Sequence, residues 1–274
     1  MQPADRPEFP AYFDQVLRTD GGDGAYFGRN VLHGLVDGIR HHCEQQARSR
    51  WISGTAVIGC AMAMDDHDLL TELRRCESSC VVVTKQEQRR YGKDAFQRLE
   101  EHAADAQGLA QSAFPELADL APTLNGEPLI VGPYGPTVDG DVPAVRELGF
   151  RKVDNQLVPI VHAKMALIGD MCWTDEHPSG HVVDHIFFVP RKLWAGSVNF
   201  TASSRRSLEF GTWITDASLL KAARRFLLGL VAMSEPLREG PDDMQPELTP
   251  VEYDDAAFIE YMREVGSWSD DPDD

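Results

Sequence analysis

The sequence contains no long hydrophobic run. No stretch approaches the roughly 20 consecutive apolar residues that a membrane-spanning helix needs, and the opening MQPADRPEFP lacks the basic and apolar regions of a secretion signal. Cysteine is scarce too: the five in 274 residues are an odd, scattered set. Such a set is typical of buried free thiols in a reducing compartment. These absences predict a cytoplasmic protein without a transmembrane segment.

Positive charge is also scarce. The chain has 26 Lys and Arg against 44 Asp and Glu, which gives a net charge of −18. Acidic residues are concentrated after residue 230, whereas residues 150–210 hold seven bases and six acids. A strongly negative surface disfavours loose binding to nucleic acid or anionic lipid, but it leaves room for a locally basic cleft.

The apolar pattern predicts an α/β domain. Residues 54–62 form a continuous apolar run typical of a buried strand, Asp65 or Asp66 caps a helix after it, and residues 80–84 form the next strand. Strand, helix and strand in this order indicate a parallel crossover unit. Asp216 caps a later helix with an apolar face. We therefore expect a mixed, largely parallel central sheet flanked by helices on both faces.

Composition divides the chain into three parts. We expect an N-terminal helical extension (1–50), a main domain (51–235) and an acidic, mobile C-terminal tail (236–274). Within the main domain we expect a helical insertion over about 86–156, with a short strand near 129–131, and a second insertion over 171–192.

Four polar side chains occur at strand-like spacing in two separate segments. His162 and Lys164 lie in the apolar run 158–168, and Ser197 and Asn199 repeat the same spacing. In a strand, residues two apart share a face. An imidazole, an ammonium, a hydroxyl and an amide aimed at one place suit a phosphate, which offers several oxygens and a centre open to attack.

His-x-Lys followed by Gly-Ser-x-Asn and the downstream Glu209 resembles the phosphodiesterase motif of the phospholipase D superfamily. The phrase GSVNFTASSRRSLEFG is close to that family's usual continuation. Two features depart from the pattern. Gly169 stands where the family has an Asp, with Asp170 one residue later, and about twenty extra residues separate the motif halves. We interpret the insertion as a hairpin between the two motif strands, with a strand from residue 181.

The resemblance implies two-step covalent phosphodiester hydrolysis without a metal or other cofactor. Two imidazoles are needed, and this chain supplies one, so a homodimer would bring two copies of His162 together. One would become a phosphohistidine while the other acts as acid and then as base. Lys164, Ser197 and Asn199 would hold phosphate oxygens. Glu209 would fix the His162 tautomer. Asp170 would act as the motif Asp through a bulge, or the Asp role would be lost.

Other residues near the motif have two interpretations each. Thr201, Ser203, Arg205 and Arg206 are candidate substrate-binding residues. The hydroxyl residues could equally cap a helix, and the arginines could lie on a solvated helix face. Glu209 alone would be a solvated acid or an ion-pair partner of these arginines. An isolated strand histidine is more often a core residue, but Lys164 on the same face argues against this for His162.

A rival site lies in the second insertion. It consists of histidines spaced by four together with nearby acids and a cysteine, namely His177, His181, His185, Cys172, Asp175 and Asp184. Such spacing can place metal ligands on one helix face. Pro178 and Gly180 disfavour a helix here, which favours surface or site-rim histidines over a metal site.

The resemblance favours a homodimeric nuclease acting on DNA or RNA, because compact single-motif family members are often nucleases. One alternative keeps the chemistry but acts on a phospholipid or a small phosphodiester. Another is a catalytically weak, phospholipase D-like subunit that needs a partner subunit in a larger assembly, which the displaced Asp170 and the long insertion suggest.

Overall fold

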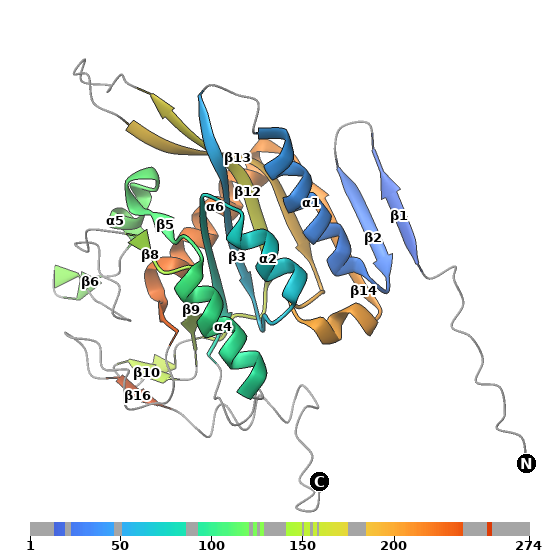
Figure 1. The fold of residues 1–274 in the computed structure, drawn as a ribbon. Helices are drawn as coiled ribbons and strands as arrows, with labels where there is room; N and C mark the ends of the chain where they lie inside the picture. Colours follow the sequence, from blue (N-terminus) through green and yellow to red (C-terminus); the bar gives the residue numbers. More distant parts are fainter. Residues whose placement is uncertain are drawn as a thin grey trace, which may run out of the picture.

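The computed structural model describes residues 14–19, 23–46, 51–85, 93–120, 123–124, 127–128, 141–149, 151–153, 156–157, 159–174, 185–237 and 251–253. The central element is a nine-stranded sheet in the order β1-β2-β14-β13-β12-β3-β4-β9-β15 (Figure 1). Its strands are β1 (Gln15–Arg18), β2 (Gly24–Gly28), β3 (Ile52–Ala61), β4 (Ser78–Thr84), β9 (Val145–Leu148), β12 (Lys164–Thr174), β13 (His185–Gly196), β14 (Glu209–Ile214) and β15 (Glu235–Pro236).

The helices are α1 (Val31–Gln46), α2 (His67–Arg74), α4 (Lys93–Asp105), α5 (Glu116–Leu120) and α6 (Ala217–Met233), with short 3₁₀ turns η2 (Gln111–Ala113) and η3 (Ala202–Arg206). Smaller sheets pair β5 (Leu109–Ala110) with β8 (Asp141–Val142), β6 (Thr123–Leu124) with β7 (Glu127–Pro128), and β10 (Arg151–Val153) with β11 (Gln156–Leu157) and β16 (Val251–Tyr253).

The sheet is mixed, as predicted, but the expectation that it is largely parallel is met only in part. Among the described strands of the main sheet, parallel pairing occurs between β3 and β4 and between β4 and β9. The other neighbours run antiparallel, because β12 and β13 form a hairpin and β14 and β2 follow them in alternating directions. The crossover unit predicted from residues 54–84 accounts for the parallel pair β3–β4, whereas the pair β4–β9 was not predicted.

Helices cover both faces of the sheet (Figure 1). The apolar run of β3 alternates between them: Ala56, Ile58 and Cys60 join the core under α6, whereas Val57 and Ala61 join the core under α1 and α2. A strand buried on both sides explains why this segment is a continuous hydrophobic run rather than an alternating one.

Two helices begin at the predicted aspartates. The Asp66 carboxylate accepts a hydrogen bond from the Leu69 backbone N–H at 3.0 Å. The Asp216 carboxylate accepts from Ser218 N–H at 3.0 Å and Leu219 N–H at 2.9 Å. Each side chain satisfies backbone donors that a helix start leaves unpaired, which is why these residues fix the starts of α2 and α6.

The second insertion lengthens the motif strands into the predicted hairpin. β12 and β13 pair from Lys164 opposite Gly196 to Thr174 opposite His185. β13 begins at His185, and the earlier part of the strand predicted from residue 181 lies outside the described residues. The two halves of the motif are therefore held side by side by one continuous ladder.

The N-terminal region differs from the helical extension expected over 1–50. It contains the expected helix, α1, but also β1 and β2, which extend the main sheet beyond β14. Likewise, the insertion over 86–156 contributes α4 and α5 but also β9. The strand expected at 129–131 and most of the acidic tail lie outside the described residues. In the described part of the chain, no helix is long and apolar enough to cross a membrane.

Candidate active site

Three adjacent strands bring the candidate residues to one end of the sheet. Lys164 begins β12 and pairs with Gly196, the last residue of β13. His162 lies two residues before this pair, and Ser197 lies directly after it. β13 pairs in turn with β14, which begins at Glu209. The strand expected over 158–168 starts only at Lys164, so His162 stands on the segment that leads into it.

The glycine of the Gly-Ser step is required by the backbone. A Cβ on Gly196 would lie 2.2 Å from the carbonyl oxygen of Phe210 and 2.8 Å from the Cα of Gly211. The next residue, Ser197, donates its backbone N–H to the same Phe210 carbonyl at 2.9 Å. Close approach of β14 therefore explains the glycine and fixes the position of Ser197.

Lys164 contacts His162 directly. Its Nζ donates to the His162 carbonyl oxygen at 2.9 Å and lies 3.5 Å from the imidazole Nδ1. Lys164 is buried, with 8% of its surface exposed, whereas His162 is exposed. A buried lysine thus places its cation beside an accessible imidazole, the candidate nucleophile.

The surroundings favour the neutral form of the imidazole. Desolvation lowers the pKa of His162 from its ordinary value, and the positive charge of Lys164 lowers it further. Desolvation also lowers the pKa of Lys164, against the opposing charge of Glu209. A neutral imidazole has the free lone pair that attack on phosphorus requires.

Substitution of Lys164 by Met should raise the pKa of His162. Loss of the neighbouring cation removes one cause of the lowering, while desolvation remains. NMR titration of the His162 ring would measure the change, with Lys221→Met on the exposed side of α6 as the control. An unchanged or lower His162 pKa in Lys164→Met would contradict the electrostatic coupling.

Ser197 and Glu209 form a hydrogen-bonded pair beside Lys164. The Ser197 hydroxyl donates to Glu209 Oε2 at 2.5 Å and accepts from the Phe210 N–H at 3.0 Å. This bond orients the hydroxyl oxygen and the carboxylate together. The role that the resemblance gives to Glu209, acceptance of a proton from His162, stays a prediction; its negative charge acts on Lys164.

Asn199 has a buried carboxamide oxygen with no hydrogen-bond donor among the described residues. Its neighbours are fixed: Phe200 donates its N–H to Ala63 at 3.1 Å, and its carbonyl accepts from Asp65 and Asp66 at 3.0 Å. A buried acceptor left unpaired costs about 1–3 kcal/mol. Such a cost at a motif position is typical of a functional group held ready for a partner.

Asp170 lies away from the other motif residues. It is six residues beyond Lys164 along β12, roughly 20 Å at the rise of a strand. It is 3% exposed. His42 Nε2 of α1 lies 3.0 Å from its Oδ1, and Arg191 Nε donates to its Oδ2 at 2.5 Å. Asp170 therefore links strand β12 to helix α1 and to strand β13.

The packing of Gly169 explains the displaced Asp. A Cβ there would lie 2.2 Å from the carbonyl oxygen of Val189 and 2.6 Å from the Phe188 ring, so no side chain fits without movement. A shift of one residue moves a strand side chain to the opposite face. The ladder is irregular here, as expected, but the extra residue is Arg191 on β13. Because the bulge is on β13 and not on β12, it does not turn the Asp170 side chain to the face that residue 169 would occupy.

Asp170→Asn should destabilise the fold and leave any catalytic step intact. Loss of the buried carboxylate removes the partner of His42 and Arg191, a cost of about 2–4 kcal/mol, less than for a fully buried pair because Arg191 is half exposed. Urea unfolding would measure the loss, and kcat well below the melting temperature should stay within about twofold of wild type. A large fall in kcat with unchanged stability would instead support a catalytic role.

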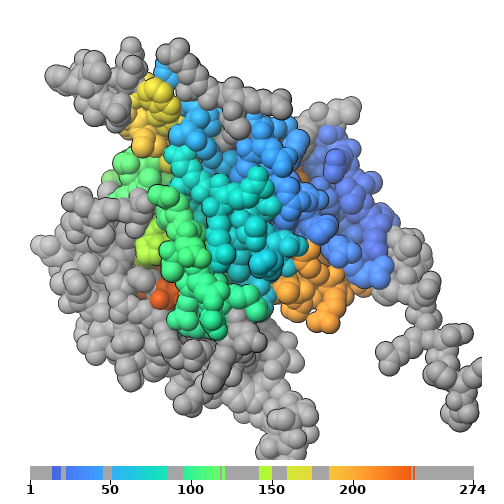
Figure 2. Space-filling model, in the orientation of Figure 1, coloured from blue at the N-terminus to red at the C-terminus, as the bar shows by residue number. Residues whose placement is uncertain are grey.

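Arg205, a candidate substrate ligand, is committed to other protein groups. Its Nε and Nη2 donate to the two oxygens of Asp66 at 2.6 and 2.8 Å. It also bonds to Asp68 at 2.9 Å and to His33 Nδ1 at 2.8 Å. Figure 2 shows the orange segment that contains η3 lying against α1 and α2. Arg205 thus holds this segment to the two helices.

The other three candidate substrate ligands are Thr201, Ser203 and Arg206. The Thr201 hydroxyl bonds to those of Ser203 and Ser204 at 3.0 and 2.8 Å, within the turn that begins η3. Arg206 is exposed. The sequence prediction missed the acceptors of Arg205, although the acidic run after β3 was a signal that could have found them. Of these candidates Arg206 and Ser203 are exposed, and Ser203 bonds to Thr201.

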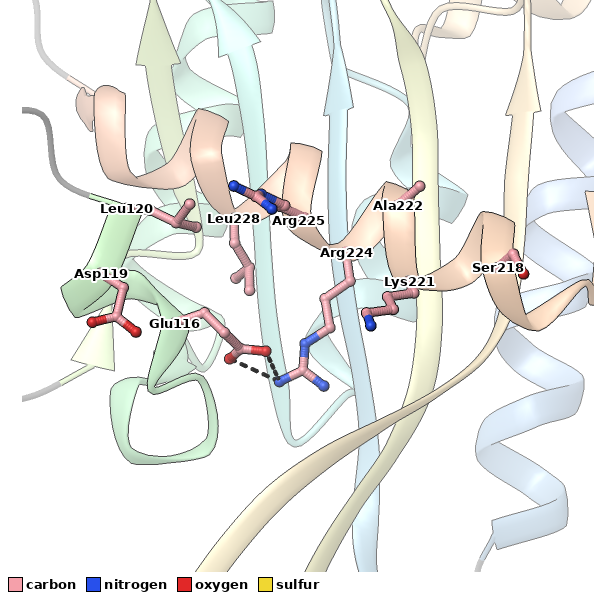
Figure 3. A pocket seen from close by; sticks show the side chains of 9 residues that line it. All are labelled: Glu116, Asp119, Leu120, Ser218, Lys221, Ala222, Arg224, Arg225 and Leu228. Carbon is pink, nitrogen blue, oxygen red and sulfur yellow. Dashed lines mark hydrogen bonds and ion pairs between the residues drawn. The ribbon is translucent and has the colours of Figure 1, made fainter.

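A hollow of about 500 Å³ lies between α5 and α6, away from the motif (Figure 3). It is lined by Glu116, Asp119, Leu120, Ser218, Lys221, Ala222, Arg224, Arg225 and Leu228. Arg224 forms an ion pair with Glu116 (Figure 3). It also donates to the Phe188 carbonyl at 2.9 Å. No motif residue lines this hollow, and Arg224 is already paired with Glu116.

The rival metal site is only partly within the structure. His177, His181, Asp175 and Asp184 lie outside the described residues. His185 stacks on Phe187, with ring centroids 6.0 Å apart. Among the described residues, no group of three or more His, Cys, Asp or Glu is arranged to hold a metal ion.

No family model matches the sequence, and no curated protein matches it. Several solved structures resemble the fold, among them the following two. NucT from Helicobacter pylori is 9% identical, with a TM-score of 0.42, and the match covers 77% of this chain and 96% of that one. A phospholipase D family member, Nuc from Salmonella typhimurium, is 13% identical, with a TM-score of 0.39 and the same coverage. Likenesses of this degree assign neither family nor function, which must come from the side chains.

Proposed function

We propose that this protein is a phosphodiesterase that acts through a covalent phosphohistidine at His162. The observation that carries the proposal is the contact of the exposed His162 imidazole with the buried Lys164 ammonium, 3.5 Å from Nδ1 to Nζ. Ser197 and Glu209 lie at the same end of the sheet. The motif's resemblance to the phospholipase D superfamily supports this assignment.

The first step is attack of the neutral His162 imidazole on phosphorus, which forms a P–N bond and breaks the P–O bond to the leaving group. Lys164 neutralises charge that builds on the phosphate oxygens, and the Ser197 hydroxyl and Asn199 amide add hydrogen bonds. Water then attacks the phosphohistidine, breaks the P–N bond and restores the imidazole. No step requires a metal.

The leaving oxygen needs a proton in the first step, and the attacking water must lose one in the second. Lys164 is assigned to charge neutralisation here, and one of its N–H groups already donates to the His162 carbonyl. We infer that a second copy of His162, supplied by a twofold-related chain, performs both transfers. The site is then shared by two chains, and each chain alone holds half of it.

Nucleic acid is the substrate that we favour. Residues 150–210 carry nearly balanced charge in an otherwise acidic chain, and Arg206 is exposed close to the motif. A polymer backbone can reach an exposed imidazole without entering a deep pocket. The acidic remainder of the chain should oppose loose, non-specific binding, so we expect a narrow range of nucleic-acid substrates.

A substrate panel with chelator tests the proposal. Purified protein would be assayed with EDTA on single- and double-stranded DNA, RNA, phospholipid vesicles and bis-p-nitrophenyl phosphate. We expect cleavage of a nucleic acid that EDTA does not abolish, and an acid-labile ³²P label on His162 after rapid quenching. Cleavage of lipid alone would assign the second substrate class. Absence of any turnover would favour the non-catalytic subunit.

A further inference from the structure

Two thiols that the proposed chemistry does not use lie next to each other. Cys43 is near the end of α1, and Cys76 lies in the turn between α2 and β4. Their sulfur atoms are 4.0 Å apart. Both belong to the core on the α1 side of the sheet, whereas Cys60 and Cys80 belong to the core on the other side. The pair is therefore separated by the sheet from those two thiols.

The two sulfurs differ in exposure. Cys43 is partly exposed, whereas Cys76 is 4% exposed, with its sulfur 3.5 Å from the Glu72 carbonyl oxygen. The hydrogen bond from Cys76 lowers the pKa of Cys43 to about 6 against the opposing effect of burial, with help from Thr55 and Arg75. The pKa of Cys76 is raised well above its ordinary value. An accessible thiolate beside a buried thiol is the arrangement of a reactive and a resolving cysteine.

We propose that Cys43 and Cys76 form a dithiol–disulfide couple that a peroxide oxidises. The Cys43 thiolate attacks one peroxide oxygen, the O–O bond breaks, and Cys43 becomes a sulfenic acid. The Cys76 sulfur then attacks the Cys43 sulfur, an S–S bond forms, and the hydroxyl leaves as water with the Cys76 proton. Two thiols lose two electrons, and the peroxide is reduced to two waters. The sulfurs must approach by about 2 Å to reach bonding distance.

The position of the couple connects it to the loop after the Gly-Ser-x-Asn motif. α1 and α2 both begin near Arg205, which binds His33 of α1 and the α2 cap Asp66. Arg40 and Glu72 join the two helices further along, at 2.8 Å. A disulfide would close the remaining end of this helix pair. Oxidation would thus stiffen the support of η3 without contacting the candidate active site.

Peptide mapping of the full-length protein tests the couple. The protein is treated with hydrogen peroxide at pH 7, blocked with iodoacetamide, digested without reductant and analysed by mass spectrometry. We expect an intramolecular Cys43–Cys76 cross-link that dithiothreitol removes, together with a rise of several degrees in melting temperature. An over-oxidised Cys43 with Cys76 still alkylated, or a cross-link only between molecules, would overturn the proposal.

Variants separate the two roles. In Cys76→Ser, peroxide should carry Cys43 on to sulfinic acid, whereas in Cys43→Ser, Cys76 should stay reduced. Iodoacetamide should alkylate Cys43 at least about tenfold faster than Cys172 in the reduced wild type. Cys172→Ser is the control, because it removes a thiol outside the pair, 8% exposed, and should leave the cross-link unchanged. If Cys172→Ser abolishes the cross-link, the assignment of Cys76 as the resolving cysteine is wrong.

Discussion

Phosphodiester hydrolysis is expected to fall by at least about 10⁴-fold when His162 is replaced by Asn. In the proposed dimer this substitution removes both the nucleophilic imidazole and the second imidazole that transfers protons. Asn keeps a polar side chain at an exposed position, so the fold should be unaffected. The control is His185→Asn at the far end of the β12–β13 hairpin, which should retain full activity. Initial rates on the best substrate, with circular dichroism of each variant, make the measurement.

The same substitution tests the shared site quantitatively. His162→Asn protein is mixed with wild type, and the chains are exchanged by unfolding and refolding together. If each dimer holds one composite site, an equal mixture should show about a quarter of wild-type activity, because activity follows the square of the wild-type fraction. If each chain works alone, the mixture should show about half. If activity falls linearly with the wild-type fraction and light scattering gives a monomeric mass, the dimer proposal is wrong, but the histidine chemistry still stands.

The features that the sequence predicted correctly are those determined by local patterns. The apolar run of β3, the caps Asp66 and Asp216, and the hairpin that joins the motif halves all follow from neighbouring residues. His162, Lys164, Ser197 and Glu209 lie at one end of the sheet because the segments that carry them adjoin through β12, β13 and β14; their roles stay a prediction.

Other features depend on contacts between distant segments, which a single sequence does not reveal. β2 was not predicted because its partner is β14, far along the chain. The position of Asp170 depends on the space that Val189 and Phe188 leave at Gly169. Arg205 was considered a substrate ligand because its acceptors, Asp66 and His33, come from elements more than a hundred residues away. In each case tertiary packing determined the outcome.

Replacement of Arg205 by Ala should lower the free energy of unfolding by about 3–5 kcal/mol, because it leaves the Asp66 carboxylate buried without its cationic partner. Asp66 is 2% exposed and accepts two bonds from Arg205 in fork geometry. The Leu69 N–H remains as a partner, but it carries no full charge. Arg206→Ala, next in sequence and exposed, is the matched control and should change stability by less than about 0.5 kcal/mol.

The effect of Arg205→Ala should depend on pH in a defined direction. Burial opposes ionisation of Asp66, but bonds from Arg205 and the Leu69 N–H outweigh it and hold its pKa below the ordinary value. A group with a lowered folded-state pKa stabilises the fold above its unfolded pKa, and that contribution is lost as pH falls through the folded value. The difference between wild type and Arg205→Ala in urea unfolding should therefore be full at pH 7 and shrink below about pH 4. A difference that stays constant from pH 7 to pH 3 would mean that Arg205 stabilises by packing alone, and the ion pair with Asp66 would then contribute nothing.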